Sequence, residues 1–128
     1  MGLINVLIFV ESRYKVNRKK IKSTVENLLQ KQEIDSPVEV SIAIVGDRKM
    51  RALSKKYKDE DKTRNVLSFS QTEGDGTKIP NENLMLGDVV ISYPQVIREA
   101  SLEEKFVDDK VNELVEHGLL HLLGIHHD

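Results

Sequence analysis

The four histidines of this chain all fall in its last twelve residues, at His117, His121, His126 and His127. His117 and His121 are four residues apart, so in a helix their imidazoles lie on the same face, one turn apart. Two imidazole nitrogens placed this way can bind one ion at about 2.0–2.1 Å each. Gly124 can end the helix in a left-handed conformation and let the chain turn back with a third imidazole. The spacing predicts a three-histidine metal site, which suits zinc and leaves a fourth position for water.

Two other interpretations of these histidines explain less. Single histidines are often core or surface residues, but two unpaired imidazoles among Leu119 and Leu122 would be costly to bury. An expression tag is a contiguous run of histidines, which this segment is not. The chain has no cysteine. That absence excludes disulfides, thiolate catalysis and cysteine-bound metals, so the ligands of any metal must be nitrogen and oxygen.

The histidine spacing is also similar to that of the metzincin metallopeptidases, His-x-x-x-His-x-x-Gly-x-x-His. Those enzymes have a glutamate directly after the first histidine, as general base for the zinc-bound water. That position is Gly118 here. Glu116 cannot replace it, because it projects about 100° away around the helix. A metallopeptidase therefore stays only as an alternative function.

The elements that must position this site are predicted as alternating strands and helices. We predict strands at 3–10, 38–45, 65–70 and 84–92, and helices at 17–31, 47–57, 94–99 and 108–123. Residues 71–83 are polar, with glycine and proline, and indicate a loop and not a domain linker. The apolar strand 84–92 is predicted to be central. The alternation indicates an α/β or α+β class with one sheet.

Composition limits the function classes further. The 128 residues are 39% hydrophobic and 31% charged, which is typical of one globular domain. The formal charge of −2 excludes a uniformly basic nucleic-acid binder and still permits a local basic patch. Three tyrosines, three phenylalanines and no tryptophan argue against a broad base-stacking platform. No apolar run is long enough to span a bilayer, and we predict a cytoplasmic protein.

Three blocks of the sequence correspond to the signatures of one known family. The family signature His-Gly-x-Leu-His-Leu-x-Gly-Tyr-Asp-His corresponds to the segment from His117 to His127. Its Tyr-Arg, charged loop and Asn-Val-Leu-Ser-Phe correspond to Tyr57-Lys58, residues 59–64 and residues 65–69. Its Leu-Gly-Asp-Ile-x-Ile strand corresponds to residues 86–91. The blocks occur in family order, and the resemblance covers nearly the whole chain. The sequence therefore resembles the YbeY family, bacterial metal-dependent endoribonucleases that mature ribosomal RNA.

The resemblance implies one YbeY-like metal-dependent hydrolase domain over residues 1–128. Its fold would be a mixed, mostly parallel sheet of about four strands, with helices packed on it and a zincin-like metal-binding helix at the C-terminus. Its activity would be zinc-dependent cleavage of single-stranded RNA in ribosomal RNA processing and ribosome quality control. Its partners would be small-subunit ribosomal RNA, the small ribosomal subunit and assembly factors, with no membrane. We predict a monomer with one Zn²⁺ per chain.

In the family register the metal ligands are His117, His121 and His127. His126 takes the place of an acidic neighbour and is predicted to be a spectator. The family arginine thought to act in catalysis is Lys58 here, which gives a point charge without a bidentate fork. Arg64 is nearby in sequence and could compensate.

The predicted chemistry is attack of a zinc-bound water on an RNA phosphodiester. Zinc lowers the pKa of this water to about 7, which makes it a nucleophile without a protein base. Lys58 is the predicted catalytic cation that stabilises charge on the phosphate oxygens, and the predicted substrate-binding residues are Lys58, Arg64 and Ser68. The basic run from Arg48 to Lys58 either follows a phosphate backbone or is a solvated helix face. Asp88 either accepts a hydrogen bond from a ligand histidine or serves a turn or cap.

A third function class keeps the same histidines. A non-catalytic ribosome-assembly factor with a structural zinc would need the three ligands and would tolerate lysine at position 58. Cleavage of RNA by the metal-loaded protein, lost on chelation, separates the enzyme from this alternative.

Overall fold

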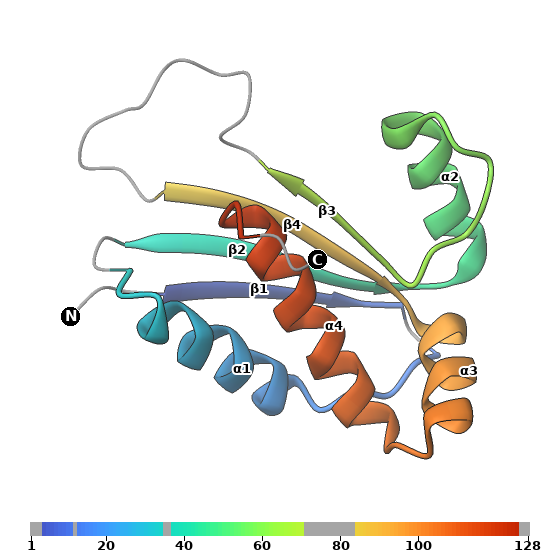
Figure 1. The fold of residues 1–128 in the computed structure, drawn as a ribbon, viewed down its shortest axis with the longest axis horizontal. Coiled ribbons are helices and arrows are strands. Elements are labelled where there is room, and N and C mark those ends of the chain that lie inside the picture. Colours follow the sequence, from blue (N-terminus) through green and yellow to red (C-terminus); the bar gives the residue numbers. More distant parts are fainter. Residues whose placement is uncertain (1–3, 12, 35–36, 71–83, 126–128) are drawn as a thin grey trace.

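The computed structural model describes residues 4–11, 13–34, 37–70 and 84–125. Its elements in chain order are β1 (Ile4–Val10), α1 (Arg18–Lys31), β2 (Val38–Val45), α2 (Asp47–Lys58), β3 (Val66–Ser70), β4 (Leu84–Ser92), α3 (Tyr93–Glu103) and α4 (Val107–Leu122) (Figure 1). Each predicted strand and helix is present. Helix α3 runs four residues past its predicted end at Glu99, because its sequence contains no helix breaker before Glu104, whose φ of 55° ends it.

The strands form one mixed sheet in the order β1-β2-β4-β3. Strand β2 pairs in parallel with β1 and β4, while β3 pairs with β4 in antiparallel orientation. This confirms the predicted mostly parallel sheet and the internal position of strand 84–92. The register shifts at Val40, which pairs with Gly87. Gly87 has a φ of 148°, and a Cβ there would lie 2.2 Å from the carbonyl oxygen of Phe69, so only glycine allows β3 this close.

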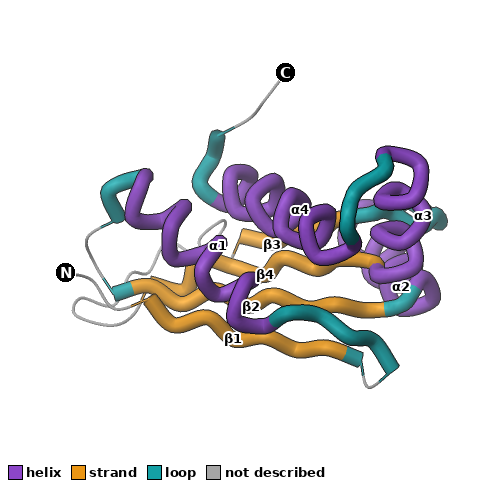
Figure 2. Tube along the Cα trace, turned by 90° about the horizontal axis from the view of Figure 1, so that it is seen from below, coloured by secondary structure: helices purple, strands orange, loops and turns teal. Residues whose placement is uncertain are grey.

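Helices α1 and α4 lie side by side over one face of the sheet (Figure 2). Asn17 caps α1 as predicted, because its side chain accepts a hydrogen bond from the backbone N–H of Lys20 at 3.0 Å. Ile21, Val25 and Leu29 recur every four residues and are fully buried against this face. The main core forms between these two helices and the alternate strand residues that point toward them.

Helix α2 covers part of the opposite face. A small second core joins Met50 of α2 to strand residues Val45, Leu67 and Val90. Asp47 fixes the start of α2, since its carboxylate accepts hydrogen bonds from four side chains: Ser92 Oγ at 2.7 Å, Thr63 Oγ1 at 3.0 Å, Gln95 Nε2 at 3.2 Å and Arg98 Nη2 at 3.2 Å. Burial opposes ionisation of this carboxyl, but these donors outweigh it and lower its pKa.

Helix α4 carries the histidine pair and packs deep in the fold. Its buried residues are Lys110, Val111, Asn112, Leu114, Val115, Gly118, Leu119 and Leu122. At Gly118 the helix meets β4 so closely that a Cβ would lie 2.6 Å from Cγ1 of Val89. In the described part of the chain, no helix combines the length and the apolar character needed to cross a membrane.

Candidate functional site

A cavity of about 260 Å³ contains most of the residues expected to carry chemistry. It is lined by Lys58, Arg64, Asn65, Val66, Leu67, Ser68, His117, Gly118 and His121. These residues come from the end of α2, the following loop, the edge strand β3 and the last turns of α4. Five of the six predicted site residues therefore share one cavity. The sixth, His127, lies outside the described residues, as does His126.

The two described histidines lie on the wall of this cavity. Their ring centroids are 4.7 Å apart, with an angle of 33° between the ring planes. Both side chains are exposed and do not pack among the helix leucines. Rings this close on one helix face can present nitrogens to one ion, since each ligating nitrogen needs to lie roughly 2.0–2.1 Å from zinc. The donor pair thus fits a transition metal.

No third histidine, cysteine or carboxylate joins this pair to complete a set of three within the described segments. Helix α4 ends as the sequence predicts. Gly124 has a φ of 79°, its N–H donates to the carbonyl of His121, and the N–H of Ile125 donates to the carbonyl of Leu120 at 2.8 Å. No atom lies within 4 Å of a Cβ built on Gly124, so glycine is needed there for conformation and not for space.

Two cations from different segments line the cavity. Lys58 is the last residue of α2, and the chain turns at Asp59, which has a φ of 55°. Arg64 forms an ion pair with Glu60, and hydrogen bonds from Lys62 and Arg64 lower the pKa of that carboxyl. Lys58 makes no ion pair with any residue in the described part of the chain. Of the two cations that line the cavity, Lys58 is therefore the one whose charge no carboxylate of the described segments neutralises.

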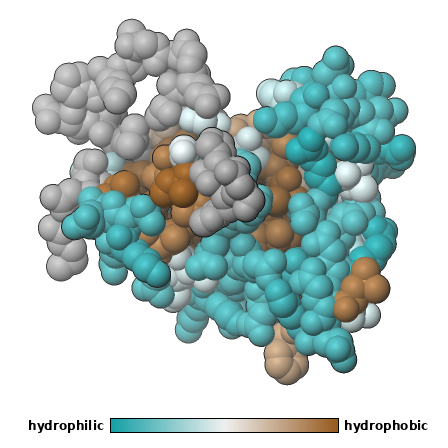
Figure 3. Space-filling view, in the orientation of Figure 1, coloured by the Kyte–Doolittle hydropathy of each residue, from teal (hydrophilic) through white to brown (hydrophobic). Residues whose placement is uncertain are grey.

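The surface beside the cavity is basic. In the space-filling view, α2 is almost entirely hydrophilic, and apolar atoms are visible beside it (Figure 3). The exposed basic residues of α2 are Arg48, Lys49, Arg51, Lys55, Lys56 and Lys58. The predicted basic run is thus one exposed helix that ends at the cavity, and this position is compatible with both interpretations of the run.

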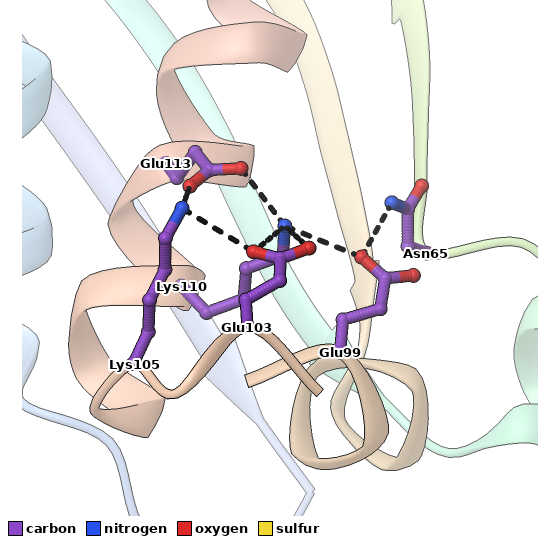
Figure 4. A network of polar contacts seen from close by, with 6 residues as sticks. All are labelled: Asn65, Glu99, Glu103, Lys105, Lys110 and Glu113. Atoms are coloured by element: carbon purple, nitrogen blue, oxygen red, sulfur yellow. Dashed lines mark hydrogen bonds and ion pairs between the residues drawn. The ribbon is translucent and has the colours of Figure 1, made fainter. Parts of the chain in front are cut away.

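Asn65 lines the cavity and is held by a polar network behind it (Figure 4). Its Nδ2 donates to Oε1 of Glu99 at 3.1 Å, and Nζ of Lys110 lies 3.4 Å from the same oxygen. Lys110 is only 4% exposed and also donates to Glu103 and Glu113, at 3.0 Å and 2.8 Å. Burial would lower the pKa of Lys110, but these carboxylates outweigh it and raise that pKa.

Sequence reasoning missed two partners of the site residues. Glu60, which binds Arg64, could have been found from the opposite charges four residues apart. The hydrogen bond from Asn65 to Glu99 could not, since 34 residues separate them. Asp88 does not line the histidine cavity. It lines a second hollow on the other side of the sheet, beside Val90.

Comparisons with known proteins point to one family. Residues 8–128 match the family model described as Endoribonuclease YbeY. A protein of that name from Magnetococcus marinus is 37% identical over 98 residues, which cover 73% of this chain and 67% of the relative. Another, from Dehalococcoides mccartyi, is 32% identical over 133 residues, which cover 97% of this chain and 77% of the relative.

A solved structure supports the fold independently. The solution structure of TM1509 from Thermotoga maritima superimposes with a TM-score of 0.59 at 21% sequence identity. The match covers 96% of this chain and 75% of that protein. At this level of identity the likeness concerns the arrangement of strands and helices.

Proposed function

The chain belongs to the YbeY endoribonuclease family, and on this premise we propose that it is a metal-dependent endoribonuclease that cleaves single-stranded RNA. One observation carries the proposal most strongly. The cavity unites a histidine pair with the side chain of Lys58, although the two come from helices far apart in the sequence. A histidine pair that can bind a metal, beside a cation, is an arrangement that can catalyse phosphodiester hydrolysis.

We propose zinc as the metal, held by His117, His121 and His127. The fit rests on the two imidazole rings, whose centroids are 4.7 Å apart, and on the left-handed Gly124 that ends α4. When bound, such an ion supplies a water that is nucleophilic at neutral pH, together with Lewis acidity toward phosphate. The neutral imidazoles leave the site a net positive charge for an anionic substrate.

The residues of the chain itself bind and orient the phosphodiester in this proposal. The ammonium group of Lys58 contacts the non-bridging oxygens, where negative charge increases in the transition state. Arg64 also lines this cavity, and its ion pair with Glu60 holds its side chain in place. It therefore contributes a positioned hydrogen-bond donor, but less net positive charge than Lys58. Ser68 offers a hydroxyl from the edge strand. A cavity of about 260 Å³ is below the roughly 300–1,000 Å³ of usual ligand pockets and suits one phosphate with its sugars.

Peptide hydrolysis is disfavoured by the packing of α4. The metzincin glutamate would occupy position 118, where even a Cβ would collide with Val89. Without it, no carboxylate directly follows the first histidine to pass a proton to an amine leaving group, and Glu116, which precedes that histidine, projects about 100° away around the helix.

The wider role follows from family membership. We propose that the natural substrate is small-subunit ribosomal RNA, and that the protein acts as a cytoplasmic monomer with the small subunit and its assembly factors in RNA maturation and quality control. The basic surface of α2 supports an RNA partner, because it continues from Lys58 away from the cavity.

The test is cleavage of a single-stranded RNA by metal-depleted protein before and after addition of zinc. We expect cleavage only with the metal, loss on chelation, no cleavage of casein, and no activity in His121→Ala. Gln30→Ala, an exposed change on α1, should behave like the parent. Cleavage that survives both chelation and His121→Ala would refute the proposal. Zinc binding without any cleavage would favour the assembly factor with a structural zinc.

A further inference from the structure

A second hollow, of about 650 Å³, lies on the opposite face of the sheet, between α2 and the strands. It is lined by Ser41, Ala43, Leu53, Tyr57, Lys58, Ser68, Phe69, Ser70, Asp88 and Val90. Lys58 and Ser68 also line the histidine cavity. The two spaces therefore meet at the outer edge of β3, and a flexible strand bound in one can continue into the other.

Two aromatic rings line this hollow. The centroids of Tyr57 and Phe69 are 4.6 Å apart, with 58° between their planes. Tyr57 is 53% exposed, and Nζ of Lys56 lies 5.1 Å from its ring centroid. An exposed ring supported by a second ring is a surface on which a flat group can stack, once the flexible side chain of Lys56, which lies over the ring, moves aside.

The hollow carries negative charge on its sheet side and positive charge on the side of helix α2. Asp88 contributes a carboxylate, and Ser41 and Ser70 contribute hydroxyls on the sheet side. The positive groups of Lys56 and Lys58 lie on the helix side. A carboxylate disfavours a phosphate on the sheet side, whereas a hydroxyl such as that of Ser41 suits the polar edge of a nucleobase. The lysines suit the phosphates that flank such a base.

We propose that this hollow is a nucleobase subsite. In this proposal, which rests on the proposed function, the base next to the scissile phosphate stacks on Tyr57 while the neighbouring Lys58 contacts that phosphate. The rings could hold a single base, which agrees with the absence of a broad aromatic platform. The occupant is single-stranded RNA because the hollow shares Lys58 and Ser68 with the histidine cavity and is bordered by the basic α2.

The first experiment uses tryptophan fluorescence. The chain has no tryptophan, so Tyr57→Trp provides a single indole in the hollow. We expect a single-stranded oligoribonucleotide to quench this emission and an abasic oligomer of equal length to quench it far less. Phe106→Trp is the matched control, because Phe106 is 81% exposed and lines neither space. If RNA binds but does not quench the emission of Tyr57→Trp, the proposal is overturned, and the hollow binds another occupant, such as a protein segment.

The second experiment separates binding from chemistry. Loss of one base–aromatic stack should raise the KM of Tyr57→Ala about tenfold, with kcat changed less than about twofold. Tyr57→Leu keeps an apolar contact with Phe69 but has no aromatic face, so it should show the same rise in KM. An unchanged KM in both variants would refute the subsite. Quenching of the indole in Tyr57→Trp does not require cleavage, so absence of ribonuclease activity would contradict the proposed function and leave the subsite to be decided by fluorescence.

Discussion

A Cβ atom on Gly118 would lie 2.6 Å from Cγ1 of Val89 and 3.0 Å from its Cγ2. Helix α4 therefore approaches β4 more closely at this point than any side chain permits. Glycine within a helix costs about 1 kcal/mol relative to alanine, so its presence here indicates a packing requirement. The close approach sets His117, the preceding residue, and His121, one turn later, beside the edge strand that completes the cavity.

Gly118→Ala should destabilise the protein in spite of the better helix propensity of alanine. Overpacking against Val89 is expected to lower the free energy of unfolding by about 1–3 kcal/mol. Urea denaturation measures this change. Glu116→Ala, an exposed change on the same helix, should stay within about 0.5 kcal/mol of the parent. A variant as stable as the parent would show that α4 can shift away from β4 at little cost.

The sequence predicted the elements well, because their signals are local. The cap at Asn17, the helical periodicity of α1 and the glycine end of α4 each depend on neighbouring residues. The sequence alone does not predict which face of β3 is buried, because Val66 is apolar although Leu67 and Phe69 point to the other face. The structure gives the reason: Val66 packs on the main core and Leu67 on the smaller core beneath α2, so both faces of this strand are covered.

Relationships between distant segments could not be predicted from local patterns. The sequence leaves two roles open for Asp88, because the face of the sheet on which its side chain lies depends on the register shift at Gly87. That shift arises from pairing with other strands. Lys110 is buried, although lysine in an amphipathic helix usually faces solvent. Two of its partners, Glu99 and Glu103, come from another helix, and nothing near Lys110 in the sequence marks them.

Lys110→Met should destabilise the junction of α3 and α4. Methionine fills a similar volume but leaves three carboxylates, those of Glu99, Glu103 and Glu113, without their shared cation. Because these carboxylates are partly exposed, we expect a loss of about 1–3 kcal/mol, less than for a fully buried pair. Urea denaturation at pH 7 tests this expectation. Lys22→Met, at an exposed position of α1, is the control, and equal stabilities of the two variants would contradict the prediction.

The same network should make the free energy of unfolding depend on pH in the acidic range. Hydrogen bonds from Lys110 and Lys105 lower the pKa of Glu103, and bonds from Lys105 and Lys110 lower that of Glu113. Their stabilisation is therefore complete above the ordinary glutamate pKa of 4.5 and is lost as the pH falls through the lowered values. The raised pKa of Lys110 keeps its contribution complete below the ordinary lysine value of 10.5.

The measurement is the difference in unfolding free energy between the parent and Lys110→Met across pH. It should be constant from about pH 6 to pH 9 and shrink from about pH 5 to pH 3. A difference that stays the same at pH 3 would show that these carboxylates do not stabilise the fold through Lys110.

Metal affinity should distinguish the two terminal histidines. In the family register His127 is the third ligand and His126 a neighbour, and both lie outside the described residues. His127→Ala is expected to weaken zinc binding strongly, since two protein ligands would remain, and His126→Ala should weaken it much less. Competition with a chelator of known affinity gives both constants. A larger loss for His126→Ala would move the ligand assignment by one residue.

Lys58 should act on the substrate and not on the metal. Lys58→Ala is expected to lower kcat/KM for RNA about 10- to 100-fold, the effect of losing one charge contact to the phosphate, with the zinc content unchanged. Lys58→Arg should equal or exceed the parent, because a guanidinium keeps the charge and adds a fork that matches phosphate oxygens. Lys55→Ala is the matched control, since Lys55 is an exposed lysine of the same helix that does not line the cavity. If Lys58→Ala and Lys55→Ala cleave RNA equally fast at equal zinc loading, then Lys58 is a general contributor to the basic surface and has no role of its own in the cavity.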